Sequence, residues 1–206
     1  MTESDFNLHN PQPLLIVISG PSGVGKDSVV QAMKARGLPF HFVVTITTRP
    51  PRSNEVHGRD YFFVSKEEFA HMIENDELFE YAIVYKDYKG SSKKGVHDAL
   101  ASGQDVVMRL DVQGAARVRK LAPQAVLIFL TTQNERELVD RLKNRRTDTP
   151  EDLSLRIATA QQELKRAPEF DYVIVNSDGC LEETVDTVTA IIRAEHHLVK
   201  PHKVSL

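Results

Sequence analysis

Continuous apolar runs, each followed by a segment with helical periodicity, constrain the fold of this chain more than any other feature. They are Leu14 to Ile18, Ala125 to Leu130, Tyr172 to Val175 and the similar run Val106 to Leu110, in which Arg109 is the one polar residue. A run that is apolar at every position predicts a strand buried on both faces, and parallel sheets contain such strands because helices cover both sides. The sequence therefore predicts an α/β fold built on a doubly wound parallel sheet.

The intervening segments divide into helices of this core and two insertions. Core helices are predicted over 27–36, 115–121, 135–144 and 181–199, from apolar residues at helical spacing. Residues 46–100 interrupt the alternation with short strands at 61–64 and 77–85 and helices at 66–74 and 93–101. This stretch is interpreted as an inserted α+β lobe. The polar stretch 144–155 is a candidate second insertion.

The length of 206 residues suits one compact domain. We expect a core at 13–45 and 101–206, the lobe at 46–100, a lid at 141–160 and a flexible leader at 1–12.

Composition and charge exclude several classes of partner. The net charge of −3 and a pI of about 6.2 argue against a nucleic-acid partner. The apolar run near the start is too short to cross a bilayer, so no membrane partner is expected. Cys180 is the only cysteine and suits a reducing compartment, so a cytoplasmic location is expected, with an organellar one left open. The histidines at 196, 197 and 202 are interpreted as a solvated tail rather than a metal site.

A glycine-rich turn between the first strand and the first helix carries the most specific local signal. Gly20, Gly25 and Lys26 satisfy the pattern G-x-x-x-x-G-K, whose backbone N–H groups and lysine bind phosphate oxygens. The predicted phosphate-binding residues are Gly20, Pro21, Ser22, Gly23, Val24, Gly25, Lys26, Asp27 and Ser28.

Asp27 stands where this pattern normally has Ser or Thr, whose hydroxyl is a Mg²⁺ ligand. One interpretation assigns its carboxylate as the metal ligand. The alternative interpretation is an anion that stabilises the helix N-terminus.

Five blocks, taken together, resemble guanylate kinases in order and spacing from about residue 14 to residue 195. They are GPSGVGK at 20–26, TTRPPR at 47–52, EVHGRDY at 55–61, DVQGA at 111–115 and DYVIVN at 171–176. The resemblance implies a P-loop fold with a GMP-binding lobe and a lid, and transfer of the γ-phosphoryl group of ATP to GMP with Mg²⁺. Within that family, the sequence is most similar in pattern to the plant organellar and bacterial-type branch. Whether dGMP is also used, and the oligomeric state, stay open.

The resemblance also implies roles for individual residues. Arg49, Arg52 and Tyr61 would hold the GMP phosphate, as planar guanidinium groups suit a dianion. Glu80 would accept from the guanine N1–H and amino group, a donor pair that adenine lacks. The remaining implied acceptor-site residues are Ser91, which could donate to the guanine O6, Thr45 and Asp111. Solvated surface charge is the competing interpretation for Glu80 and for either arginine alone.

On the donor side, Arg141, Arg145 and Arg156 would close over the ATP phosphates, and Asn176 would lie near the adenine. Catalysis would rest on Lys26, Arg49, Arg145 and Arg156, because phosphoryl transfer needs alignment and positive charge. The competing interpretation for Arg141 is a salt-bridged helix face with Glu137 and Asp140.

Three residues depart from the family pattern. They are Asp27, Arg109 where many members have Asp, and Lys89 where a Tyr is common. We expect Asp27 and Arg109 to contact each other, because the residue after the P-loop lysine lies near the end of the neighbouring strand. Such a contact would leave the Mg²⁺ shell to water and phosphates.

Two other functions compete with the one that the resemblance implies. One is a non-catalytic guanylate-kinase-like interaction module, although such modules tend to lose the P-loop lysine or the lid arginines. The other is a kinase for another phosphorylated small molecule, such as ribose 1,5-bisphosphate, although Glu80 and Ser91 together favour guanine.

Overall fold

The computed structural model describes residues 11–53, 55–84, 86–143, 150–202 and 204. Most of the predicted leader therefore lies outside the described residues. Within the described part, no helix is long and apolar enough to cross a membrane.

The main sheet has five strands, all parallel, in the order β2-β7-β1-β8-β9. They are β1 (Leu15–Ser19), β2 (Phe40–Phe42), β7 (Asp105–Arg109), β8 (Val126–Thr131) and β9 (Tyr172–Val175). The predicted α/β class and four of these strands are confirmed. The three-residue edge strand β2 was not predicted, because it is too short to show a periodicity.

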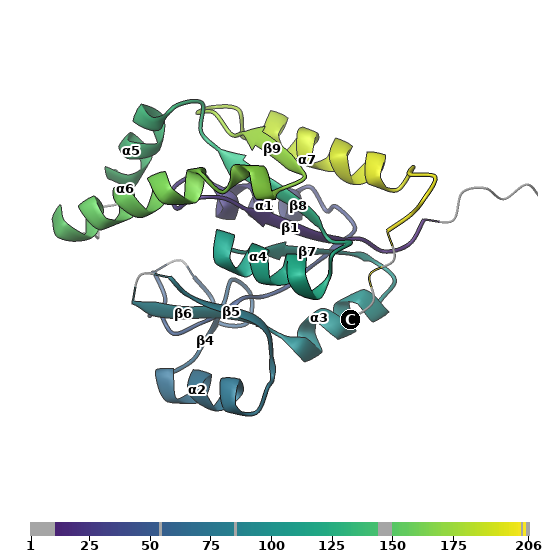
Figure 1. Ribbon diagram of the computed structural model, residues 1–206, viewed down its shortest axis with the longest axis horizontal. Coiled ribbons are helices and arrows are strands. Elements are labelled where there is room, and N and C mark those ends of the chain that lie inside the picture. The colour runs from purple at the N-terminus through teal and green to yellow at the C-terminus, as the bar shows by residue number, and fades with distance from the viewer. Residues whose placement is uncertain (1–10, 54, 85, 144–149, 203, 205–206) are drawn as a thin grey trace, which may run out of the picture.

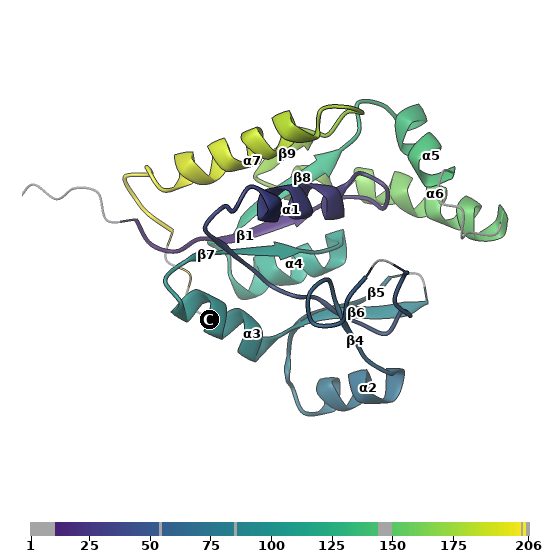
Figure 2. The same cartoon turned by 180° about the vertical axis from the view of Figure 1, so that it is seen from behind.

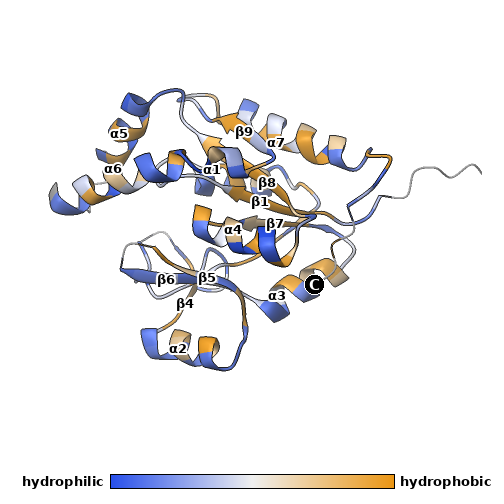
Figure 3. Ribbon diagram, viewed as in Figure 1, coloured by the Kyte–Doolittle hydropathy of each residue, from blue (hydrophilic) through white to orange (hydrophobic). Residues whose placement is uncertain are grey.

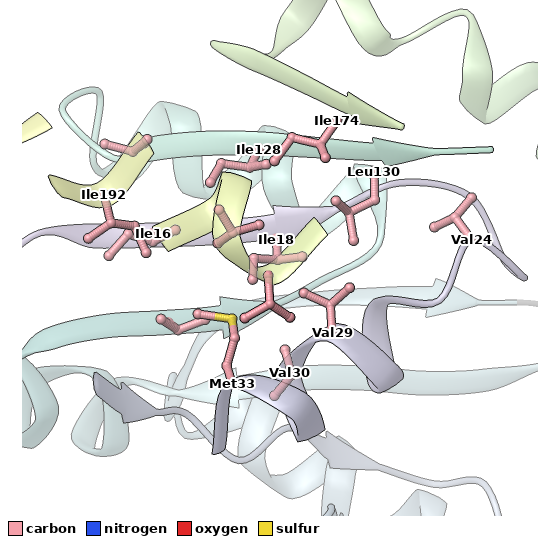
Figure 4. Packing of buried hydrophobic residues seen from close by; sticks show 14 of the residues in the cluster. Ile16, Ile18, Val24, Val29, Val30, Met33, Ile128, Leu130, Ile174 and Ile192 are labelled. Atoms are coloured by element: carbon pink, nitrogen blue, oxygen red, sulfur yellow. The ribbon is translucent and has the colours of Figure 1, made fainter. Parts of the chain in front are cut away.

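Helices cover both faces of this sheet, as Figure 1 shows. One face packs against α1 (Lys26–Ala35) and α7 (Leu181–Glu195), and the other against α3 (Lys93–Ala101) and α4 (Val112–Leu121). Alternate residues of β1 enter the two cores, so the strand is buried on both sides. Figure 4 shows one of these cores, and Figure 3 shows the apolar strands between helices with polar outer faces.

A second sheet of four strands lies beside the carboxyl-terminal part of the main sheet (Figure 2). Its order is β4-β3-β6-β5, formed by β3 (Ile46–Thr47), β4 (Phe62–Phe63), β5 (Leu78–Val84) and β6 (Asp87–Ser92). The helix α2 (Lys66–Glu74) covers its outer face, where the fully buried Phe69 stacks on Tyr88. The opposite face of the sheet carries the side chains that enter the candidate site.

Two further helices, α5 (Glu135–Lys143) and α6 (Pro150–Leu164), pack on each other at the edge of the main sheet. A short 3₁₀ helix, η1 (Ala167–Glu169), leads from α6 to β9. The sequence indicated only a polar insertion over part of α6, since its apolar positions are few. The helix nevertheless forms, with Ala160 buried in the core shared with α1 and α7.

The chain after α7 differs from the prediction. The helix ends at Glu195, not at residue 199, and the following chain turns back. His196 Nε2 lies 2.7 Å from Asp105 Oδ2 at the start of β7, and His202 Nε2 lies 2.7 Å from Glu195 Oε2. The solvated-tail interpretation is therefore wrong for these two histidines, because tertiary partners hold them.

Candidate active site

A cleft of about 630 Å³ opens at the carboxyl ends of the parallel strands, between the P-loop, the second sheet and α6. Ligands of open α/β sheets bind at this edge. The predicted site residues that line it are Gly20, Pro21, Ser22, Gly23, Gly25, Lys26, Asp27, Ser28, Thr45, Arg49, Arg52, Tyr61, Glu80, Asp111, Arg141, Arg156 and Asn176. Residues scattered over 150 positions of sequence are thus brought to one cavity.

The P-loop is so tightly wound that two of its glycines leave no space for a side chain. Gly20 and Gly25 both have positive φ, and an added Cβ would lie 2.2 Å from Leu130 O and 2.4 Å from Asn176 Nδ2. Lys26 Nζ donates to the carbonyl oxygens of Gly20 and Pro21. Burial lowers the pKa of this ammonium. A cation is thus held at the mouth of a loop whose N–H groups can bind phosphate.

Asp27 and Arg109 form the contact that the sequence predicted. Arg109 Nη1 lies 2.8 Å from Asp27 Oδ1, and the Arg109 side chain is only 12% exposed. The same guanidinium lies over the ring of Tyr61, 4.4 Å from its centroid, and donates to the Asp60 carbonyl oxygen. Two substitutions that look unusual separately therefore form one ion pair beside the P-loop lysine.

Arg49 and Arg52 converge on a single carboxylate, that of Glu55. Both terminal nitrogens of Arg49 lie 2.8 Å from the Glu55 oxygens, and Arg52 Nη1 lies 3.6 Å from Oε1. Burial alone would raise the pKa of Glu55, but hydrogen bonds from Arg49 and the Arg52 amide outweigh it and hold that pKa below its ordinary value. The Arg49 guanidinium also lies 5.1 Å from the centre of the Tyr61 ring. The paired arginines thus form a basic, aromatic-backed wall of the cleft.

Glu80 is not an exposed strand carboxylate. It is 3% exposed, and its Oε1 accepts a hydrogen bond of 2.9 Å from the Ser91 hydroxyl on the neighbouring strand. Burial, with a smaller contribution from the charge of Asp111, raises its pKa to about 8. Ser91 lies behind Glu80 and does not itself line the cleft. A buried carboxylate at the end of a cleft is a strong selector for a ligand with paired N–H donors.

Thr45 and Asp111 have structural partners as well as a place in the cleft. Thr45 is buried, and its hydroxyl lies 3.5 Å from the Arg109 carbonyl oxygen. Asp111 Oδ1 accepts from the amides of Gln113 and Gly114 and so caps the N-terminus of α4.

Arg141 and Asn176 connect α5 and the end of β9 to the P-loop. Asn176 Nδ2 donates to the Val24 carbonyl oxygen at 2.8 Å, and Arg141 Nη1 lies 3.4 Å from the same oxygen. Arg141 also pairs with Glu137, as the competing interpretation expected, and with Asp178 in place of Asp140. The arginine therefore both bridges its own helix and borders the cleft.

The helix α6 brings one positive and one negative side chain to the cleft, Arg156 and Glu163. Glu163 Oε2 is buried and has no hydrogen-bond partner among the described residues. Burial raises the pKa of this carboxyl, and the charge of Lys26 opposes that rise. Arg145, a predicted catalytic residue, lies outside the described residues.

The cleft lining includes charged residues that the sequence analysis did not assign to the site, and it lacks two residues that were assigned to it. Lys89, Arg109 and Glu163 line the cavity, whereas Val24 and Ser91 are buried and do not line it. Strand alternation could have indicated Lys89, because it shares a face with Ser91. No local pattern marks Glu163, which looks like an ordinary helix-surface carboxylate.

Comparison with known proteins agrees with this geometry. The family model for guanylate kinase matches residues 12–195. A rice protein (Oryza sativa subsp. japonica) named guanylate kinase 2, chloroplastic/mitochondrial, is 52% identical over 194 residues, which cover 94% of this chain and 67% of that protein. The guanylate kinase of the bacterium Caldanaerobacter subterraneus subsp. tengcongensis is 41% identical over 192 residues, covering 93% of this chain and 92% of the relative.

A solved structure of a guanylate kinase also resembles the fold of this chain. The crystal structure of guanylate kinase from Anaplasma phagocytophilum superimposes with a TM-score of 0.76 at 27% identity, covering 92% of this chain and 89% of that one. The predicted resemblance, including its plant organellar and bacterial relatives, is thus confirmed. A P-loop, a buried Glu–Ser pair and converging arginines around one cleft, together with a family match along nearly the whole chain, lead to one conclusion: the chain belongs to the guanylate kinase family.

Proposed function

We propose that this protein transfers the γ-phosphoryl group of ATP to GMP, giving ADP and GDP. The observation that carries the proposal is the buried Glu80, which accepts a hydrogen bond from Ser91 and lines the same cleft as the P-loop. A guanine offers two adjacent N–H donors, its N1–H and its amino group, to a carboxylate. Adenine lacks this donor pair, so AMP would leave a buried acceptor without a donor.

The division of the cleft follows from its two anion-binding walls. The P-loop and Lys26 would bind the phosphates of ATP, with Arg141 and Asn176 near the nucleoside end. Arg49, Arg52 and Tyr61 would bind the phosphate of GMP on the lobe at 46–100. The segment 141–160, with Arg145 and Arg156, would act as the lid. Alignment of the two phosphates, with positive charge around the migrating group, would supply the catalysis.

The side chains in the cleft are compatible with Mg²⁺ held chiefly by substrate. Mg²⁺ is usually bound by one or two carboxylates together with phosphates and water. Asp27 lines the cleft, and its Oδ1 is bound to Arg109, whose positive charge would weaken the attraction of this carboxylate for a cation. Among the described residues no group of three His, Cys, Asp or Glu forms a protein-only metal site. Bound to the ATP phosphates, the ion would neutralise charge that develops on the migrating group.

A coupled ADP-release assay tests this function. We expect turnover with GMP and ATP and much slower turnover with AMP, UMP or ribose 1,5-bisphosphate as acceptor. Lys26→Ala should abolish turnover. Glu80→Gln should reduce the preference for GMP over AMP, while Glu77→Gln, on an exposed residue outside the cleft, is the matched control and should leave it unchanged. Absence of turnover by the wild-type protein with GMP would refute the proposal and favour an interaction module.

A further inference from the structure

Lys89 stands on the inner face of the second sheet, in β6. It has the same parity along the strand as Ser91, and its neighbours in register are Thr47 and Ala82. Side chains two residues apart on a strand share a face, so Lys89 points to the cleft side together with the Glu80–Ser91 pair. The opposite face of the same strand carries Tyr88, which stacks on Phe69 beneath α2.

The ammonium group of Lys89 lies where the two halves of the cleft meet. Its Nζ is 6.0 Å from the centre of the Tyr61 ring, which belongs to the acceptor wall. It also interacts electrostatically with Lys26 and Asp27 at the start of α1, on the donor side. A single cation is thus close to both predicted phosphate positions.

The charges that face Lys89 come from several elements. They are Lys26, Asp27, Arg109, Asp111, Glu163 and the phenol of Tyr61. Glu80 lies on the same sheet face but is bound to Ser91. Burial, reinforced by the positive charge of Lys26, lowers the pKa of Lys89 to about 8. An arriving phosphate dianion would reverse this shift, because an opposite charge favours the protonated form.

We propose that Lys89 is a further catalytic residue, whose ammonium group contacts the acceptor phosphate and the phosphoryl group that is transferred to it. This inference rests on the proposed function. No neighbouring side chain already neutralises Lys89 in the way that Asp27 neutralises Arg109 and Glu55 neutralises Arg49, since no salt bridge to Lys89 occurs among the described residues. Its charge is therefore directed to a ligand, and it supplements Lys26 from the lobe side.

Steady-state kinetics of Lys89→Met at pH 7 provide the first test. Loss of one charge-assisted contact should lower kcat/KM for GMP by roughly 10- to 100-fold, with most of the loss in kcat if the contact strengthens in the transition state. Lys66→Met, an exposed lysine on α2, is the matched control and should behave as wild type. Thermal unfolding at pH 7 should show that Lys89→Met is no less stable, because the substitution removes a partly buried charge.

The second test is calorimetric binding of GMP and guanosine at pH 7 and pH 9. The ratio of the two affinities isolates the phosphate, because ionisation of Glu80 and of the base affects both ligands. In the wild type, Lys89 is charged at pH 7 and mostly neutral at pH 9, so the ratio should fall by up to about tenfold. Lys89→Arg, which keeps its charge throughout, should show no such fall, and neither should Lys89→Met.

The two tests separate the inference from the function on which it rests. If the wild-type protein turns over GMP but Lys89→Met retains kcat/KM for GMP within threefold, the inference is overturned and the proposed function stands. An affinity ratio that does not change with pH in the wild type, or that falls equally in Lys89→Met, overturns it as well. If the wild-type protein neither binds nor phosphorylates GMP, the proposed function itself fails.

Discussion

Replacing Glu80 by Gln should stabilise the empty protein, and the gain should depend on pH. Glutamine has nearly the same shape, and its side-chain carbonyl can still accept from Ser91. What changes is the ionisation, because burial raises the pKa of Glu80 from 4.5 to about 8. The native state therefore holds a proton that the unfolded chain releases, and stability falls as the pH rises from 4.5 to 8.

The size of this effect follows from the two pKa values. One pKa unit corresponds to about 1.4 kcal/mol, so ionisation of Glu80 costs the wild type ~3 kcal/mol at pH 7 and close to nothing at pH 4.5. Glutamine does not ionise and avoids the cost. For a chain of this length, 1 kcal/mol moves Tm by roughly 2–4 °C, so Glu80→Gln should raise Tm by about 6–12 °C at pH 7.

Thermal unfolding at pH 5 and pH 7, without nucleotide, provides the measurement. The difference in Tm between Glu80→Gln and wild type should be several times larger at pH 7 than at pH 5. Glu77→Gln, on an exposed carboxylate, should show no difference at either pH. An equal shift at both values would refute the reasoning, since it would show that the ionisation of Glu80 is not what destabilises the wild type.

Three further predictions concern the cleft and the core beneath it. Gly114→Ala should raise KM for GMP but not for ATP in steady-state assays, because the new Cβ would lie 2.6 Å from Glu80 Oε2; an unchanged KM would show that Glu80 can move aside. Asp27→Ser and Arg109→Asp should each lower kcat/KM more than the double variant does, because either alone leaves an uncompensated charge, whereas additive effects would contradict the coupling. Met33→Ala, at a fully buried position, should lower the free energy of unfolding by ~2–5 kcal/mol in urea titrations, and a loss below 1 kcal/mol would show that the core collapses around the cavity.

The main sheet and the P-loop could be predicted because their signals are local. The strand β1 is apolar from Leu15 to Ile18 and buried at every position, and the glycines at 20 and 25 are required by their own backbone geometry. The end of α7 could not be predicted in this way. It depends on His196 meeting Asp105, and the two residues are 91 positions apart.

Most site residues were predicted from the five blocks that resemble guanylate kinases, and few from burial or periodicity. Glu80 has no sequence feature that distinguishes it from an exposed strand carboxylate; only the pairing of β5 with β6 and the packing of α4 bury it. Glu163 was missed for the same reason, since a carboxylate within a polar helix shows no sign that the P-loop lies beside it. Pairwise contacts across the fold, not composition, assign such residues to the cleft.

Glu55 was not predicted as a site residue, yet it fixes the position of the arginines that would bind the acceptor phosphate. It accepts two hydrogen bonds from the Arg49 guanidinium group and another from the Arg52 amide. An arginine side chain held in one rotamer loses about 2 kcal/mol of conformational entropy. Because Glu55 restrains Arg49 in the empty protein, most of that loss occurs once, during folding, and not each time an acceptor enters. The guanidinium group would also keep its position after product leaves, ready for the next molecule.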